Sequence, residues 1–150
     1  MLKIFSENKF KTTFLIISLF GILLSAYLWQ VQAQAESPDF FVPCTDNGCE
    51  NVLTSDYSKL LGVPISVFGL FFYCFMALVS FQRIYISHKL LDYIFYALLA
   101  WGLVFSLYLR YLEFAKIGDV CIWCWVSFLM ILAMCGMSIY EFRASRKATT

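Results

Sequence analysis

The sequence predicts an all-α integral membrane protein: a single domain, residues 1–150, folded as a four-helix transmembrane bundle. Its residues are 61% hydrophobic and only 14% charged, which leaves too little polar surface for a soluble globule. Runs free of Asp, Glu, Lys and Arg occupy residues 12–31, 63–82, 93–109 and 120–140. Each run has, or nearly has, the roughly 20 residues that a helix needs to cross a bilayer. Because lipid cannot hydrogen-bond to a backbone, these runs are expected to be helices.

The first predicted span, residues 12–31, has two interpretations. Basic residues before it and an A-x-A sequence at residues 33–35 resemble a cleaved signal peptide. However, the run exceeds the roughly 7–15 residues of a signal-peptide core. Tyr27 and Trp29 also suit a membrane interface at its end. We therefore expect a retained anchor, and either outcome leaves the later segments on the same sides of the membrane.

Residues 32–62 are predicted to form an outer loop that carries a cysteine pair. Cys44 and Cys49 enclose turn-forming residues, so they lie on a short, polar turn. A disulfide that closes so small a ring removes little chain entropy. The pair therefore suits thiol exchange, and a structural disulfide that holds a surface loop remains an equal alternative.

A short amphipathic helix is expected between this turn and the second span. Apolar side chains recur there at i, i+4, i+7 and i+8, at positions Leu53, Tyr57, Leu60 and Leu61. Gly62 is expected to cap this helix, and Pro64 to open the next span. Lying flat on the membrane, the helix would cover the outer mouth of the bundle. An ordinary interfacial helix without a catalytic part is the alternative.

The other three spans are expected at residues 63–82, 93–112 and 120–140. The third run is the shortest, so its span has to include Arg110, whose guanidinium is expected to snorkel to the interface. Cys74 and Cys135 each fall about 16 Å along their helices, at about 1.5 Å per residue. Cysteines buried at that depth usually pack as small hydrophobes, so we expect no redox role for either.

The distribution of Lys and Arg predicts the orientation in the membrane. Basic residues precede the first span, lie between the second and third spans, and follow the last span: Lys3, Lys9, Lys11, Arg83, Lys89, Arg143, Arg146 and Lys147. Such segments are usually cytoplasmic. The connectors 32–62 and 110–119 are poor in bases and should face outward, so both termini lie inside. For an inner-membrane protein the cysteine-bearing loops then lie on the periplasmic or extracytoplasmic side, where disulfides persist.

A C-x-x-C motif, Cys121 and Cys124, lies where the second outer connector ends and the last span begins. If Asp119 or Val120 is the last residue before the helix, both sulfurs lie in its first turn on one face. Unpaired N–H groups and the positive end of the helix dipole favour a thiolate there. Such a pair can store electrons as two thiols and release them as a disulfide.

Aromatic side chains near this motif could line a pocket for a flat ring. Trp123 lies inside the motif, and Phe68, Phe72 and Phe128 are expected at the same end of the bundle. Core packing and interface belts are the more ordinary role of each ring. The one histidine, His88, falls in the inner connector, which argues against a Cys–His hydrolase.

Several motifs follow one another in a fixed order along the chain: Cys44-x4-Cys49, Ser55, Gly62, Phe68-Gly69, Ser106-x-Tyr108-Leu109 and Cys121-x-x-Cys124. This order resembles the vitamin K epoxide reductase family over residues from roughly Leu19 to Met137. A C-x-x-C motif alone is weakly specific. Two cysteine pairs in this order on a four-span scaffold are much more so.

The resemblance implies a quinone-dependent thiol oxidoreductase that generates disulfides. In that family the loop pair takes electrons from a soluble thioredoxin-like (DsbA-type) partner and passes them to the C-x-x-C pair, which reduces a membrane quinone. Carried over by position, Cys44 would meet the partner, Cys49 would attack Cys121, and Cys124 would be the thiolate that faces the quinone. The resemblance adds Ser55 to the expected quinone contacts and implies no metal.

Two positions depart from the animal members of that family. Those members carry an Asn just before the Ser that matches Ser66 and a Tyr four residues past the second cysteine of the motif, where this chain has Ile65 and Phe128. The departures favour a plain ubiquinone- or menaquinone-type quinone over the vitamin K epoxide. Some bacterial members carry a fused thioredoxin-like domain; here the partner is expected to be a separate protein.

Two other classes of function remain open at the level of the sequence. The chain could be a non-catalytic four-span scaffold whose cysteine pairs are structural disulfides. Alternatively, the outward-facing cysteines could together hold one structural zinc ion, although an oxidising compartment disfavours that arrangement.

Overall fold

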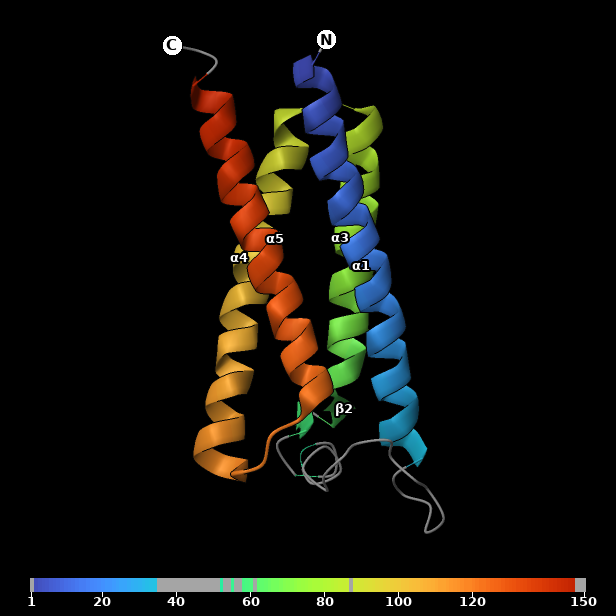
Figure 1. Cartoon of the computed structure of the whole chain (residues 1–150). Helices are drawn as coiled ribbons and strands as arrows, with labels where there is room; N and C mark the ends of the chain where they lie inside the picture. The colour runs from blue at the N-terminus through green and yellow to red at the C-terminus, as the bar shows by residue number, and fades with distance from the viewer. Residues whose placement is uncertain are drawn as a thin grey trace.

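The structure is a computed structural model that describes residues 2–34, 52, 55, 58–60, 62–86 and 88–147. It is built from α1 (Leu2–Gln34), α3 (Ile65–Tyr85), α4 (Lys89–Leu112) and α5 (Ile122–Lys147) (Figure 1). All four helices are long and apolar enough to cross a membrane. The predicted fold class, an all-helical bundle with four apolar spans, is therefore confirmed.

The helices alternate in direction, so the bundle has two distinct ends. The N- and C-termini lie at one end, at the top of Figure 1. The end of α1, the start of α3, the end of α4 and the start of α5 meet at the other end. We call this second end the cysteine end, because Cys121 immediately precedes α5 there.

The helices extend beyond the charge-free runs that predicted them. Helix α4 begins at Lys89, where the His88 side chain accepts a hydrogen bond from the Leu90 N–H at 3.2 Å. It continues into a π-helical turn, η2 (Glu113–Ile117), which ends at Gly118 with a φ of 78°. The Gly118 N–H donates to the Glu113 carbonyl at 2.9 Å. The left-handed glycine therefore closes the turn and redirects the chain toward α5.

A two-stranded hairpin stands where the amphipathic helix was expected to end. Strand β1 (Lys59–Leu60) pairs antiparallel with β2 (Val63–Pro64), and Gly62 lies in the turn with a φ of 82°. The prediction that Gly62 caps a helix is therefore wrong. Its freedom to adopt a positive φ serves a hairpin turn instead. The amphipathic helix itself is not shown, since Leu53, Tyr57 and Leu61 lie outside the described residues.

All four helices contribute to one central core, a buried cluster of Phe14, Tyr73, Met76, Phe95, Leu99, Ile131 and Met134. Cys135 packs against this cluster, and Cys74 is half-buried in the middle of α3. At the terminal end of the bundle, Arg83 binds Asp92 at 2.7 Å and Glu141 at 3.4 Å. This cluster joins α3, α4 and α5, so polar contacts fix the end of the bundle that lies away from the cysteines.

Candidate functional site

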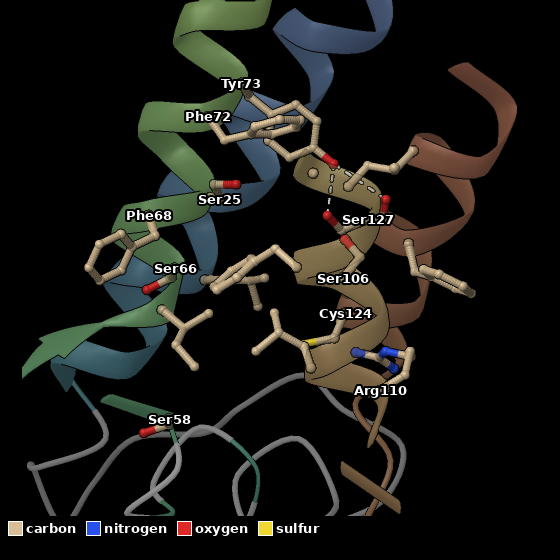
Figure 2. Close-up of a pocket in the computed structure, with 18 of the residues that line it drawn as sticks. Ser25, Ser58, Ser66, Phe68, Phe72, Tyr73, Ser106, Arg110, Cys124 and Ser127 are labelled. Atoms are coloured by element: carbon tan, nitrogen blue, oxygen red, sulfur yellow. Dashed lines mark hydrogen bonds between the residues drawn. The ribbon is translucent and has the colours of Figure 1, made fainter. Parts of the chain in front are cut away.

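A cavity of 410 Å³ lies among the four helices toward the cysteine end (Figure 2). Its walls are mainly apolar and include Phe68 and Phe72 from α3 and Phe128 from α5. Polar side chains stand at its edges, among them Arg110 from α4 and Cys124 from α5. The cavity therefore combines an apolar interior with a small number of groups that could react or form hydrogen bonds.

The C-x-x-C motif straddles the start of α5. The helix begins at Ile122, and the Cys121 carbonyl accepts the first helical hydrogen bond, from the Trp125 N–H at 3.1 Å. Cys121 is thus the N-cap residue, and Cys124 is the third residue of the helix. The last residue before the helix is therefore Cys121, and not Asp119 or Val120 as supposed from the sequence, because the chain stays irregular until Cys121.

Glu113 holds the motif from the preceding helical turn. Its Oε1 accepts a hydrogen bond from the Cys121 N–H at 2.7 Å. In a capping box, the acidic side chain three residues into the helix accepts this N–H. Cys124 occupies that place here, so a carboxylate from η2 supplies the contact instead. Cys121 has 0% exposure and Glu113 has 2%, so the contact is buried.

Arg110 pairs with Glu113 one helical turn away and points into the protein. The two form an ion pair, and Arg110 keeps only 9% of its surface exposed. The guanidinium carbon of Arg110 also lies 5.4 Å from the centre of the Trp125 ring. The prediction that Arg110 snorkels to the interface is therefore wrong, because a buried counter-charge replaces the water that snorkelling would reach.

The two thiols interact directly. Cys124 lines the cavity, whereas Cys121 is fully buried and is not among the lining residues. A hydrogen bond from the Cys124 side chain lowers the pKa of the Cys121 thiol, although burial acts in the opposite direction. The negative charge therefore resides most readily on Cys121, with Cys124 as the hydrogen-bond donor.

Hydrogen-bonded side chains close the cavity at two further edges. The Gln32 amide donates to the Ser58 hydroxyl at 3.0 Å and accepts from the Ser66 hydroxyl at 2.9 Å. On the inner side, the Tyr73 hydroxyl and the Ser127 hydroxyl are 2.8 Å apart (Figure 2). All five residues line the cavity. They tie helices together and also present oxygens and N–H groups to whatever occupies it.

The structure brings together some of the residues expected at the site and separates others. Phe68, Phe72 and Phe128 line the cavity beside Cys124. Trp123 is not among the lining residues; its ring packs against Tyr27 on α1, with the centroids 5.6 Å apart. Successive residues of a helix point in different directions, and Trp123 therefore faces α1 while Cys124 faces the cavity.

The remaining predicted residues belong to the outer loop. The Ser55 hydroxyl donates to the Val52 carbonyl at 2.9 Å, and Ser55 is not among the residues that line the cavity. Cys44 and Cys49 lie outside the described residues. Their expected exchange with Cys121 therefore stays a prediction.

Sequence reasoning passed over three polar residues of this site: Gln32, Tyr73 and Glu113. For Glu113 a signal existed, because Arg110 and Glu113 are opposite charges at i, i+3 at the end of an apolar run. Charged residues in such a run usually pair with each other and mark functional positions. For Gln32 and Tyr73 the sequence offers no comparable signal, because their partners lie on other helices.

Comparison with known proteins identifies one family. The model of the vitamin K epoxide reductase family matches residues 12–139. This range includes part or all of each of the four apolar helices and contains the C-x-x-C motif. No curated protein matches the chain.

Proposed function

The chain belongs to the vitamin K epoxide reductase family, and on that premise we propose that it transfers electrons from a soluble thioredoxin-like protein to a membrane quinone. Family membership implies thiol–disulfide oxidoreductase activity in a membrane protein. The quinone and the partner are the proposal. One observation carries it: Cys124 forms part of the wall of an apolar cavity inside the membrane-spanning bundle.

The cavity suits a quinone ring. Its volume of 410 Å³ falls in the range of about 300–1,000 Å³ that is usual for small-molecule sites. Aromatic walls can stack on a flat ring, and the Gln32–Ser66 edge offers hydrogen-bonding groups to a carbonyl oxygen. Phe75 and Trp101 line the cavity and are also exposed on the lipid-facing surface. That side of the cavity would allow an isoprenoid tail to extend into the bilayer.

Two residues favour a ubiquinone- or menaquinone-type acceptor over an epoxide. Ile65 and Phe128 both line the cavity, and neither side chain has a hydrogen-bond donor. Opening an epoxide requires a donor at its oxygen, and these two positions do not supply one. Reduction of a plain quinone depends less on such a donor, because the ring accepts the electrons.

The proposed relay moves two electrons through both cysteine pairs. The partner's two thiols reduce the Cys44–Cys49 disulfide, and the partner leaves as a disulfide. The Cys49 thiolate then attacks Cys121 in the Cys121–Cys124 disulfide and releases Cys124, and Cys44 resolves the Cys49–Cys121 bond. The reduced C-x-x-C pair closes its disulfide again and gives two electrons and two protons to the quinone, which leaves as hydroquinone. Cys121 has 0% exposure, so this exchange requires the residues that cover it to move.

We further propose the orientation that the basic residues predict, with both termini in the cytoplasm. Exposed basic residues such as Lys89 and Arg143 belong to the end of the bundle that holds the termini. The cysteine end would then face the oxidising compartment, where a thioredoxin-like partner can reach the outer loop.

The central test is quinone reduction by the purified protein in liposomes. A reduced thioredoxin-like protein serves as donor, short-chain ubiquinone and menaquinone analogues serve as acceptors, and quinone absorbance is followed. We expect one quinone reduced for each partner disulfide formed, and Cys121→Ala and Cys124→Ala should abolish the reaction. Cys74→Ala, which replaces a cysteine outside the cavity, is the matched control and should retain the wild-type rate. A wild-type rate no faster than the protein-free background would rule out the relay.

A further inference from the structure

We propose that the buried Arg110–Glu113 ion pair sets the reduction potential of the Cys121–Cys124 couple, with its two charges acting in opposite directions. The proposal rests on the proposed function, in which this couple passes electrons to a quinone. It assigns positioning roles to two residues outside the cysteine motifs, Arg110 as the cation beside the pair and Glu113 as its counter-charge.

The geometry places both charges against the thiols. Arg110 lines the cavity together with Cys124, and Figure 2 shows the guanidinium beside this cysteine. Arg110 and Glu113 both act electrostatically on Cys124. Glu113 also accepts a hydrogen bond from the Cys121 N–H at 2.7 Å, so the carboxylate is held against the backbone of the first cysteine of the motif.

Burial makes these charges effective. Arg110 is 9% exposed and Glu113 is 2% exposed, so water screens their fields only weakly. Keeping two charges inside an apolar bundle is costly, and apolar residues in their place would often be as stable. Stability alone therefore does not explain the ion pair, whereas an electrostatic effect on the neighbouring thiols does.

The direction of each effect follows from the charge on the reduced couple. Oxidation of the dithiol forms the disulfide and releases two electrons and two protons, and the reduced form carries negative charge when one thiol ionises. Arg110 stabilises that charge and hence the reduced form, which makes the disulfide a stronger oxidant. Glu113 disfavours the same charge and makes the disulfide a weaker oxidant.

Redox titration of the couple tests the proposal without quinone or partner. Cys44 and Cys49 are replaced by Ala, so that the C-x-x-C pair is the couple that responds. The protein is equilibrated in glutathione buffers near pH 8, and free thiols are counted by a maleimide mass tag. The variants are Glu113→Gln, whose amide oxygen can still accept the Cys121 N–H, and the double variant Arg110→Gln/Glu113→Gln. Both variants lack the Glu113 carboxylate, so neither leaves a buried negative charge without Arg110 as its partner.

We expect the Cys121–Cys124 couple to have a higher, more oxidising reduction potential in Glu113→Gln than in the parent protein. Removing Arg110 from that background should lower the equilibrium constant for disulfide reduction at least about tenfold, equivalent to roughly 30 mV. The reduction potential of Arg110→Lys, which keeps the positive charge, should remain close to that of the parent protein. The differences should shrink as the pH falls, because both thiols become protonated and the reduced couple loses its charge.

Two results would overturn the proposal: equal potentials in all these variants, or changes of the same sign that do not depend on pH. A purely structural ion pair predicts the second pattern, since loss of packing does not reverse with the sign of the charge removed. The outcome is separable from that of the proposed function. Shifted potentials without quinone reduction would refute only the relay, and quinone reduction with unchanged potentials would refute only the role of the ion pair.

Discussion

At the scale of single residues, the chemistry depends on which way a few side chains point. Cys121 and Cys124 are three residues apart, yet Cys121 is fully buried away from the cavity lining and Cys124 forms part of the cavity wall. This division suits two tasks, because Cys124 can meet a ligand in the cavity, and Cys121 can exchange with another thiol once the residues that cover it move. The carboxylate that caps Cys121 comes from eight residues earlier, where Glu113 ends an apolar helix.

The hydrogen bond between the two thiols leads to a prediction about pH. Because the Cys124 thiol stabilises the Cys121 thiolate, the pKa of Cys121 is lowered, and its reactive form persists to lower pH than that of an ordinary thiol. Cys124→Ala removes the donor, so the alkylation rate of Cys121 should begin to rise at higher pH. The rate is measured with iodoacetamide across a pH series.

The control for this measurement is a protein in which the other cysteines, Cys44, Cys49, Cys74 and Cys135, are replaced by Ala in both variants. The comparison then isolates the effect of Cys124 on Cys121. Identical pH profiles with and without Cys124 would show that the donor does not govern ionisation.

At the scale of elements, close helix packing shapes the cavity. Gly102 on α4 faces the ring of Phe72 on α3, a residue that lines the cavity. A Cβ atom at Gly102 would lie 2.4 Å from the ring carbon Cζ of Phe72. The ring therefore keeps its position only because α4 has no side chain there, and the size of the cavity depends on this packing between helices.

Gly102→Ala should impair quinone reduction by displacing Phe72. The gain in helix propensity is about 1 kcal/mol, whereas overpacking costs about 1–3 kcal/mol, so the clash should dominate. We expect a higher KM for the quinone together with equal or lower thermal stability, measured by quinone titration and by thermal unfolding in detergent.

Gly136→Ala on α5 is the matched control for this substitution. A Cβ atom there has no neighbouring atom within 4 Å, so the same change should leave the KM unaltered. If both variants show the same KM as the parent protein, the packing of Phe72 against Gly102 does not shape the quinone site.

At the scale of the whole molecule, polar contacts near both ends fix an otherwise apolar bundle. The Arg83 cluster joins three helices at the terminal end, and the Arg110–Glu113 pair joins α4 to the start of α5 at the cysteine end. Because lipid provides no hydrophobic force between helices, such polar contacts and close packing determine how the helices associate. The two ends differ in their exposed basic residues, such as Lys89 and Arg143 at the end that holds the termini, and this difference underlies the proposed orientation.

Single-cysteine labelling on intact cells tests that orientation. Exposed positions at the two ends are Lys116 and Arg143, so Lys116→Cys and Arg143→Cys are made in a background without native cysteines. A membrane-impermeant maleimide should label Lys116→Cys directly and Arg143→Cys only after permeabilisation. The reverse pattern would place the C-x-x-C motif in the reducing compartment and remove the basis of the proposed relay.

The sequence alone determined the four apolar helices and the redox motif at the start of the last one. These features are local: the length of a run without charges decides whether it can span a bilayer, and the spacing of two cysteines decides whether they share a helix face. The family pattern was readable for the same reason, since its motifs keep their order along the chain.

Only the tertiary structure decided how the helices face one another. It turned Arg110 inward to Glu113 rather than outward to the interface, directed Trp123 to α1 rather than to the cavity, and brought Gln32 to Ser66 across two helices. These outcomes depend on the rotation of each helix about its axis. Hydropathy leaves that rotation open in a helix that is apolar on nearly all sides, because interhelical packing and buried polar pairs determine it.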